Sequence, residues 1–203
     1  DSRKKLRYTL SVDYYAYDEK GRNTVNIVPY VSYRFSDRLS ASWNSSIQNS
    51  NNNTGFAGRN ATDIFIGRRR VNSVDNSIGA QYTINDKMGL NFSFRHYYSE
   101  VNYKQFYTLN EDGTLTNAPD FNRDNATFNT WNIDLRYSWW FAPGSQLTLL
   151  YRNATQNYLS NSRINFKNNF NQLFDEPMAN NISLKITYFL DYNKVKSWVK
   201  SSK

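Results

Sequence analysis

Cysteine is absent from the 203 residues of the chain. Its absence excludes a disulfide framework, thiolate chemistry and cysteine-ligated metal sites, and it leaves the redox compartment undetermined. The sequence contains no phosphate-binding glycine loop and no cluster of metal ligands, so no cofactor is expected. It also lacks any apolar run near the about 18 to 20 residues that a membrane-spanning helix needs.

Hydropathy alone would place the chain among water-soluble proteins, because its hydrophobic fraction is 39% and its mean hydropathy is −0.78. This does not exclude a membrane protein, since a membrane β-barrel carries apolar residues only at every second position of its strands. The aromatic fraction of 17%, with 16 tyrosines, 13 phenylalanines and 5 tryptophans, is more informative. Tyrosine and tryptophan favour both strands and the interface between a membrane and water.

Alternation of apolar and polar residues is clearest in the segment 131–141. Its odd positions are all apolar or aromatic: Trp131, Ile133, Leu135, Tyr137, Trp139 and Phe141. A period of two indicates a strand with one apolar face. Pro143 and Gly144 then favour a tight reversal, after which the alternation resumes. This part of the sequence therefore predicts an antiparallel hairpin with long strands.

The same alternation predicts eight strands in all, over residues 6–17, 25–35, 39–48, 74–84, 88–98, 131–141, 147–158 and 182–192. Pro29 cannot donate a ladder hydrogen bond, so we expect a bulge or a locally unpaired position there. The intervening segments are polar and irregular, and they are predicted to be long loops: 49–72, apart from a short strand at 64–66, then 110–125 and 160–180.

These long loops alternate with short turns at Asp37, Asp86 and Gly144. Outer-membrane barrels have short periplasmic turns and longer extracellular loops. The sequence therefore predicts an all-β fold, an antiparallel up-and-down transmembrane β-barrel over residues 1–193, in the bacterial outer membrane. Residues 194–203 are predicted to be a basic periplasmic tail, which either rests on lipid headgroups or is disordered.

Three segments, 64–93, 128–152 and 183–188, also resemble a known family. Their motifs include Phe65-Ile66-Gly67-Arg68, Leu135-Arg136-Tyr137, Pro143-Gly144-Ser145 and Ser183-Leu184-Lys185-Ile186-Thr187-Tyr188. They resemble the C-terminal barrel of a large Bacteroidota family of outer-membrane proteins of unassigned function. In that family the barrel is longer than eight strands and follows a domain similar to carbohydrate-binding family 9 modules. The resemblance implies the C-terminal part of a larger barrel, a missing N-terminal domain as a partner, and a link to glycan handling.

Charges recur on the face opposite the apolar one, which is unusual for the inside of a soluble sandwich. The predicted lumen-facing charges are Asp13, Arg34, Asp75, Arg95, Asp134, Arg136, Arg152, Lys185 and Asp191. They could line a polar pore that selects solutes. Alternatively, they pair across neighbouring strands and fill the interior, as expected for a closed barrel of eight strands. In a larger barrel both interpretations stay open.

Contacts with lipid are predicted at two places. Arg68, Arg69 and Arg70 are expected where lipopolysaccharide phosphates would lie, because arginine forks match phosphate oxygens. The alternative is a solvated loop cluster. Interfacial aromatic residues are expected at Trp131, Trp139, Phe141, Tyr188 and Tyr192. Outer-membrane lipid, lipopolysaccharide and other outer-membrane proteins are therefore the predicted partners.

The only histidine, His96, limits the catalytic chemistry. The alternation places it on the lipid-facing side of its strand, near the outer rim, with Phe92, Phe94 and Tyr98. A single histidine there is typical of an interfacial residue rather than of a general base. The acidic residues near the rim have no spacing typical of a catalytic site: Glu100, Asp112 and Asp120. The protein is therefore expected not to be an enzyme.

Together these patterns favour a membrane anchor or conduit. The main alternative is a soluble β-barrel or sandwich that binds carbohydrate or another small ligand through tyrosine and tryptophan platforms. Nucleic acid is not an expected partner despite the net charge of +8, because the basic residues are spread over both strand faces and the loops without a recognition helix. The first residue is Asp1 and no signal peptide precedes it, so we expect a mature form or a piece of a longer protein.

Overall fold

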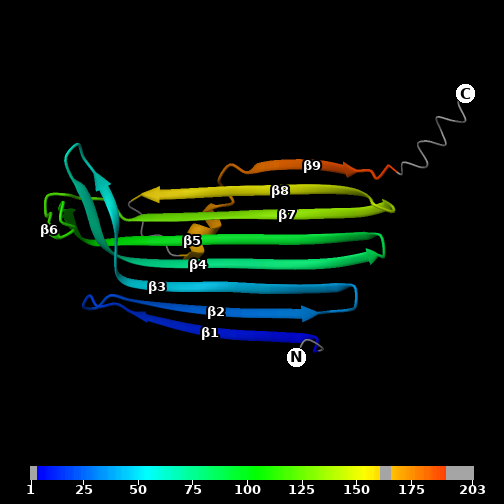
Figure 1. The fold of residues 1–203 in the computed structure, drawn as a ribbon, viewed down its shortest axis with the longest axis horizontal. Helices are drawn as coiled ribbons and strands as arrows, with labels where there is room; N and C mark the ends of the chain where they lie inside the picture. The colour runs from blue at the N-terminus through cyan, green and yellow to red at the C-terminus, as the bar shows by residue number, and fades with distance from the viewer. Residues whose placement is uncertain (1–3, 161–165, 191–203) are drawn as a thin grey trace, which may run out of the picture.

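The computed structural model describes residues 4–160 and 166–190, which form one antiparallel β-sheet with a short helix (Figure 1). Eight strands lie side by side in the order β1-β2-β3-β4-β5-β7-β8-β9, and β6 pairs only with β5. The elements are β1 (Leu6–Ala16), β2 (Asn23–Arg34), β3 (Leu39–Arg59), β4 (Ile64–Asn85), β5 (Met88–Leu109), β6 (Leu115–Asn117), β7 (Ala126–Ala142), β8 (Ser145–Ser160), α1 (Phe166–Gln172) and β9 (Ala179–Thr187). The predicted all-β, antiparallel fold is therefore confirmed.

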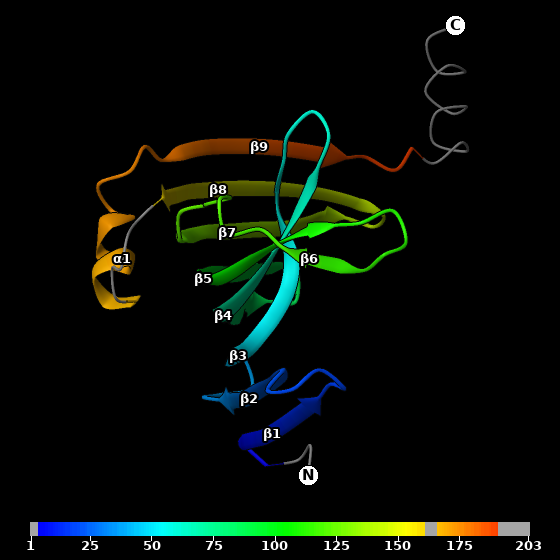
Figure 2. The ribbon, with the colours of Figure 1, turned by 90° about the vertical axis from the view of Figure 1, so that its left-hand side faces the viewer.

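The sheet is open in the described part of the chain. β1 pairs only with β2 and β9 pairs only with β8, so each lies at an edge of the sheet. Figures 1 and 2 show these two strands on opposite sides of the molecule. Eight strands at their usual spacing place the edges about 34 Å apart, so only a strongly curved sheet could join them. These eight strands alone therefore do not close into a barrel.

The prediction of a long loop over residues 49–72 is wrong. β3 runs on to Arg59 and β4 begins at Ile64, so both strands extend as one long hairpin that ends in the turn 60–63. The predicted short strand at 64–66 is the start of β4. Register shifts between Ser50 and Asn53, and again between Phe56 and Gly58, mark β-bulges that reverse the alternation. These bulges hide the period of two from the sequence.

The other two predicted loops also contain regular structure. β5 continues past residue 98 to Leu109, and the segment 110–125 includes the short strand β6. In the segment 160–180 the described residues include helix α1 and the first residues of β9. The prediction of an irregular loop over residues 160–180 therefore missed a helix.

Two predictions about single residues are confirmed. Around Pro29 the β1–β2 ladder is continuous, whereas the β2–β3 ladder skips from the pair Ile27↔Ile47 to the pair Tyr30↔Asn44. Pro29 is thus the locally unpaired position that its missing N–H requires. Gly144 forms the β7–β8 turn with a φ of +69°, a conformation that glycine adopts without strain.

The two faces of the sheet differ in what lies against them. We call the face that carries Ile78 and Leu135 the apolar face, and the face that carries Arg95 and Asp134 the polar face. Figure 2 shows α1 beside the sheet. Phe166 and Phe170 of α1 contact the rings of His96 and Trp131 on the apolar face. The segment 118–123 lies against the polar face near the β3–β4 hairpin, where Phe121 stacks on Phe65 with ring centroids 3.9 Å apart.

Candidate functional site

Large apolar side chains are exposed along the apolar face from one edge of the sheet to the other. Examples, taken in the order of the strands, are Leu10, Ile27, Trp43, Ile78, Leu135, Tyr151 and Ile182. Monomeric soluble proteins rarely expose a continuous apolar patch larger than a few hundred Å². An exposed apolar face of this extent is typical of a surface that contacts lipid or another protein.

The apolar band on this face has a diagonal outer boundary, where outer means toward the β3–β4 hairpin tip. The outermost large apolar residues of the band are Tyr14, Val25, Ile47, Val74, Tyr98, Trp131, Tyr151 and Ile182, from β1 to β9. Strand pairing places Ile182 level with Leu6 through a continuous row of partners. The outer boundary of the band is therefore level with Tyr14 at the β1 edge of the sheet and level with Leu6 at the β9 edge.

The difference in level between Tyr14 and Leu6 gives the angle between the outer boundary of the band and the rows of paired residues. Leu6 and Tyr14 are separated by about 27 Å along β1, and the eight strands span about 34 Å. The boundary therefore runs at about 39° to the rows of paired residues, which are perpendicular to the strands. One row within the band is interrupted by Ser45, Asn76 and His96, of which Ser45 and His96 are buried.

The polar face carries the charges that were predicted to face a lumen. Strand register places eight of them on this one face: Asp13, Arg34, Asp75, Arg95, Asp134, Arg136, Arg152 and Lys185. The ninth, Asp191, lies outside the described residues. Five of the eight are cationic and three are anionic, so this face has an excess of positive charge.

Asp134 joins two of these cations. Its carboxylate accepts hydrogen bonds from Arg152 Nε at 2.6 Å and Arg152 Nη2 at 3.0 Å, and Arg95 Nη2 lies 3.8 Å from Oδ2. Because the three residues come from β5, β7 and β8, this cross-strand ion pair holds the centre of the face in register. The predicted pairing of inward charges is thus present at Asp134.

Replacing Asp134 by asparagine is expected to cost about 1 kcal/mol of stability or less, because Arg95 and Arg152 are about half exposed and stay solvated. Denaturant unfolding of the reconstituted protein measures the effect. Asp13→Asn is the matched control, since Asp13 accepts only a 3.5 Å hydrogen bond from Asn26. Equal losses for the two variants would show that the ion pair contributes nothing specific.

The polar face contains several hollows, including one that spans β1 to β5 and one that spans β7 to β9. The first, of about 370 Å³, is lined mainly by small and polar residues, including Ser32, Ser42 and Gly79, and by Arg7, which donates a 3.3 Å hydrogen bond to Ser32. The second, of about 480 Å³, lies between Arg136 and Lys185 and has no acidic residue in its lining. The second hollow therefore offers positive charge and hydroxyl groups without a counter-charge from the protein.

His96 is not the lipid-facing residue that the sequence predicted. The alternation places it on the apolar face, but it is only 2% exposed because Phe166 and Phe170 of the α1 segment pack edge-on against its ring. Its Nε2 lies 2.7 Å from Asn129 Oδ1, and its Nδ1 lies 3.4 Å from Asn76 Nδ2. Because an amide oxygen only accepts, Nε2 donates and the imidazole is in one defined tautomer.

Trp131 is buried at the same place. Its indole is 5% exposed, lies against Phe170 and Phe174, and donates a 3.2 Å hydrogen bond to Asn153 Oδ1. Asn129 is fully buried and donates to Asn169 of α1. α1 thus covers polar side chains that the apolar face would otherwise present to its surroundings, and together they form a packed, hydrogen-bonded cluster.

The arginine run 68–70 is divided between the two faces, because consecutive residues of a strand point to opposite sides. Arg69 is on the polar face, where it donates a 2.9 Å hydrogen bond to Asn53. Arg68 and Arg70 are on the apolar face. The three side chains therefore do not form the single cluster that the sequence predicted.

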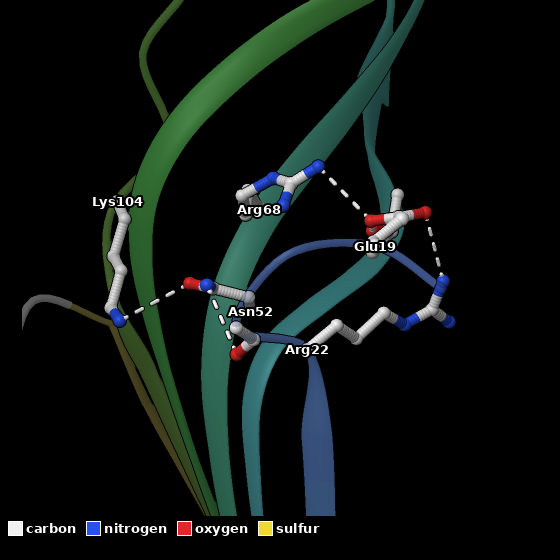
Figure 3. Close-up of polar contacts among 7 residues, drawn as sticks. Glu19, Arg22, Asn52, Arg68 and Lys104 are labelled. Atoms are coloured by element: carbon white, nitrogen blue, oxygen red, sulfur yellow. Dashed lines mark hydrogen bonds and ion pairs between the residues drawn. The ribbon is translucent and has the colours of Figure 1, made fainter. Parts of the chain in front are cut away.

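A different group forms around Arg68, which we call the outer cationic cluster (Figure 3). It consists of Glu19, Arg22, Asn52, Arg68 and Lys104, which come from the β1–β2 turn, β3, β4 and β5. Glu19 bridges Arg22 at 3.1 Å and Arg68 at 3.0 Å. No sequence pattern predicted that Glu19, Arg22 and Lys104 lie together, because bulges and a turn bring them into proximity.

The predicted interfacial aromatic residues lie at different places. Trp139, Phe141 and Tyr188 group near the β7–β8 turn, with centroids 5.6 Å apart for the first pair and 6.3 Å for the second. Trp131 belongs instead to the cluster under α1, which corrects its assignment as an interfacial residue. Tyr192 lies outside the described residues.

The acidic residues Glu100, Asp112 and Asp120 lie in separate surroundings. Glu100 accepts hydrogen bonds from Asn72 and Asn102 on the apolar face. Asp112 lies in the exposed β5–β6 turn, where hydrogen bonds from the side chain and backbone of Thr114 lower its pKa. Asp120 lines a hollow of about 500 Å³ beside Phe121. Among the residues that the structure describes, no three His, Cys, Asp or Glu side chains gather as a metal site would need.

The sequence model of one protein family, described as "Domain of unknown function (DUF5916)", matches residues 1–199. No curated protein and no solved structure matches the chain. Within the described residues, no helix has both the length and the apolar character needed to cross a membrane.

Proposed function

We propose that this chain, which belongs to the DUF5916 family of domains of unknown function, forms part of the wall of a β-barrel in the bacterial outer membrane. The diagonal apolar band carries this proposal. Strands of outer-membrane barrels are tilted by about 35–45°, so an apolar band that is level in the membrane must run diagonally across their register. The boundary from Tyr14 to Ile182 has a slope of about 39°.

The height of the band supports the same proposal. On β2 it extends from Val25 to about the end of the strand at Arg34, with Phe35 just beyond it. Val25 and Phe35 are separated by about 34 Å along the chain, which at this tilt is about 26 Å along the membrane normal. The lipid-facing band of outer-membrane barrels is about 25 Å tall.

The open edges of the sheet require further strands in a membrane. An unpaired strand edge in the hydrocarbon region would leave backbone N–H and C=O groups without partners, at a cost of several kcal/mol each. We infer that β1 and β9 pair with strands outside the described sheet, so that the complete barrel has more than eight strands. The polar face then lines an interior wide enough to hold water.

The protein acts in this proposal as a membrane anchor or a conduit and not as an enzyme. The charged polar face supports a water-filled interior, because only one carboxylate, Asp134, has an ion pair among the predicted inward charges in the described residues. A link to glycan handling depends on the family resemblance alone. It would be excluded if the full gene encoded no carbohydrate-binding-like domain.

Detergent dependence tests the proposal against a soluble carbohydrate-binding protein. Native protein from outer membranes should need detergent to stay dispersed, and its electrophoretic mobility should change on boiling. Its native mass should exceed the 23.9 kDa of this chain, either because the gene product is longer or because copies associate. A monodisperse protein without detergent and with unchanged mobility would instead favour the soluble binder.

A conduit with this wall should prefer anions. The polar face carries excess cations, and the hollow between Arg136 and Lys185 lacks an acidic residue. Replacing both by glutamine should lower the anion-to-cation permeability ratio about two- to threefold. Reversal potentials in planar bilayers under a salt gradient measure the ratio. An unchanged reversal potential would contradict this role of the two cations. Absence of conductance would contradict the conduit and favour the membrane anchor.

A further inference from the structure

The outer cationic cluster lies on the apolar face, beyond the outer boundary of the band. Val74 is the outermost apolar residue of the band on β4, and Arg68 lies further out on the same face of that strand. The two are separated by about 20 Å along the strand, or about 16 Å along the membrane normal at the tilt of the band. If the apolar band faces lipid, the cluster faces the polar layer outside it.

Charge in this cluster is unbalanced. Arg22, Arg68 and Lys104 contribute three positive charges, and among the residues that the structure describes Glu19 supplies the only carboxylate that reaches them. Lys104 Nζ contacts only an amide oxygen, that of Asn52, at 3.4 Å. The Nε atoms of Arg22 and Arg68 are buried and have no hydrogen-bond partner among the described residues. The cluster thus retains a net positive charge, which is suited to an anion.

The cluster is held in place by contacts from several segments. Glu19 reaches across β3 to Arg68, and Thr54 donates a 3.4 Å hydrogen bond to the same carboxylate oxygen (Figure 3). Asn52, at the bulge with a φ of 47°, donates a 3.2 Å hydrogen bond to the carbonyl oxygen of Gly21. Arg22 lies over the ring of Tyr17, with 4.5 Å from its guanidinium carbon to the ring centroid. The side chains are therefore ordered before any ligand arrives, which lowers the entropic cost of binding.

A belt of amide side chains lies between the apolar band and the cluster. Its members are Asn23, Asn49, Asn51, Asn72 and Asn102. Asn49 donates a hydrogen bond to Asn72 at 2.5 Å and Asn51 to Asn23 at 3.1 Å, whereas Asn102 donates to Glu100 at 2.9 Å. Amide groups both donate and accept, so this belt offers partners to sugar hydroxyl groups.

These positions indicate the class of lipid. The headgroup layer of an ordinary phospholipid bilayer is only about 5–8 Å thick on each side, which is too thin to reach Arg68 and Lys104. A glycolipid whose sugars extend outward and carry phosphates would meet the amide belt first and the cations next. We propose that the outer cationic cluster binds phosphate groups on the headgroup sugars of an outer-leaflet glycolipid of the lipopolysaccharide type. This inference rests on the proposed membrane orientation.

Binding of purified lipopolysaccharide to the full-length, detergent-purified protein tests the proposal. The variant Arg68→Gln/Lys104→Gln should bind about tenfold more weakly, because charge-assisted contacts to phosphate are lost. The control Arg136→Gln/Lys185→Gln removes the same charge from the polar face and should bind as the unaltered protein does. Chemically dephosphorylated lipopolysaccharide should bind the unaltered protein about as weakly as phosphorylated lipopolysaccharide binds the cluster variant.

Glu19→Gln separates a binding role from a structural one. Glutamine keeps an amide oxygen that can still accept hydrogen bonds from Arg22 and Arg68, but it removes the negative charge. The variant should therefore bind lipopolysaccharide several-fold more tightly, whereas a cluster that only holds the strands together would show no such gain. Weaker or unchanged binding would overturn the proposal. So would full competition by millimolar inorganic phosphate, which would assign the site to the free ion, or equal binding of dephosphorylated lipopolysaccharide.

The membrane orientation is tested separately, with the same preparation. Unchanged mobility on boiling together with dispersal without detergent would refute the proposed function. Normal heat modifiability with no effect of Arg68→Gln/Lys104→Gln on binding would refute only the glycolipid site.

Discussion

An arginine in place of Ile78 is expected to lower the free energy of unfolding from a lipid bilayer by about 2–4 kcal/mol. Ile78 lies on the apolar face of β4 near the middle of the band and is 40% exposed. A water-facing residue with this exposure would tolerate arginine with a change within about 0.5 kcal/mol. The large effect follows only if lipid surrounds the side chain, because a guanidinium loses its hydration there.

The same substitution on the other face is the control. Gln81→Arg places the new charge on the polar face of the same strand, where the proposed interior contains water, and should change stability by less than about 1 kcal/mol. Urea unfolding from vesicles, followed by tryptophan fluorescence, measures both variants. Similar small effects at the two positions would contradict a lipid-facing band and would favour a soluble sheet or a protein partner on this face.

Alternation was sufficient to predict most of the sheet from sequence. It identified the eight strands of the main path and the face of the eight described inward charges, because a period of two is a direct consequence of strand geometry. It could not predict how far β3, β4 and β5 extend. Bulges at Asn52 and near Lys104 shift the period by one residue, so the outer ends of these strands look irregular in the sequence.

Contacts between distant segments explain what else the sequence did not reveal. His96 was assigned to the correct face, but nothing in its own strand indicates that α1 covers it. A signal for the helix exists: Phe166, Phe170 and Phe174 recur at helical spacing and all contact the sheet. The outer cationic cluster had no such signal, because it depends on a turn and two bulges.

The sequence pattern does not predict how the two edges of the sheet pair. Strand pattern and loop parity are the same in an eight-strand barrel and in eight strands of a larger one, so they cannot decide how the edges pair. The structure decides only that β1 and β9 do not pair with each other.

Trp131→Ala tests whether α1 is an essential cover of the apolar face. The substitution is expected to cost about 3–5 kcal/mol, because it removes a buried indole and leaves a cavity beneath Phe170 and Phe174. It also leaves Asn153 without the indole donor. Denaturant unfolding in the same vesicles gives the loss of stability.

Trp140→Ala is the matched control, because Trp140 is 48% exposed and lies on the opposite face of β7 near the turn. Its loss should stay well below that of Trp131→Ala. Protease cleavage within 166–178 provides a second measurement. If α1 depends on Trp131, cleavage should become several-fold faster in Trp131→Ala and stay unchanged in Trp140→Ala. Equal stability losses with unchanged cleavage would mean that α1 is held by its own chain connections. The polar residues His96, Asn129 and Asn153 would then need another explanation on this face, since lipid would not tolerate them unpaired.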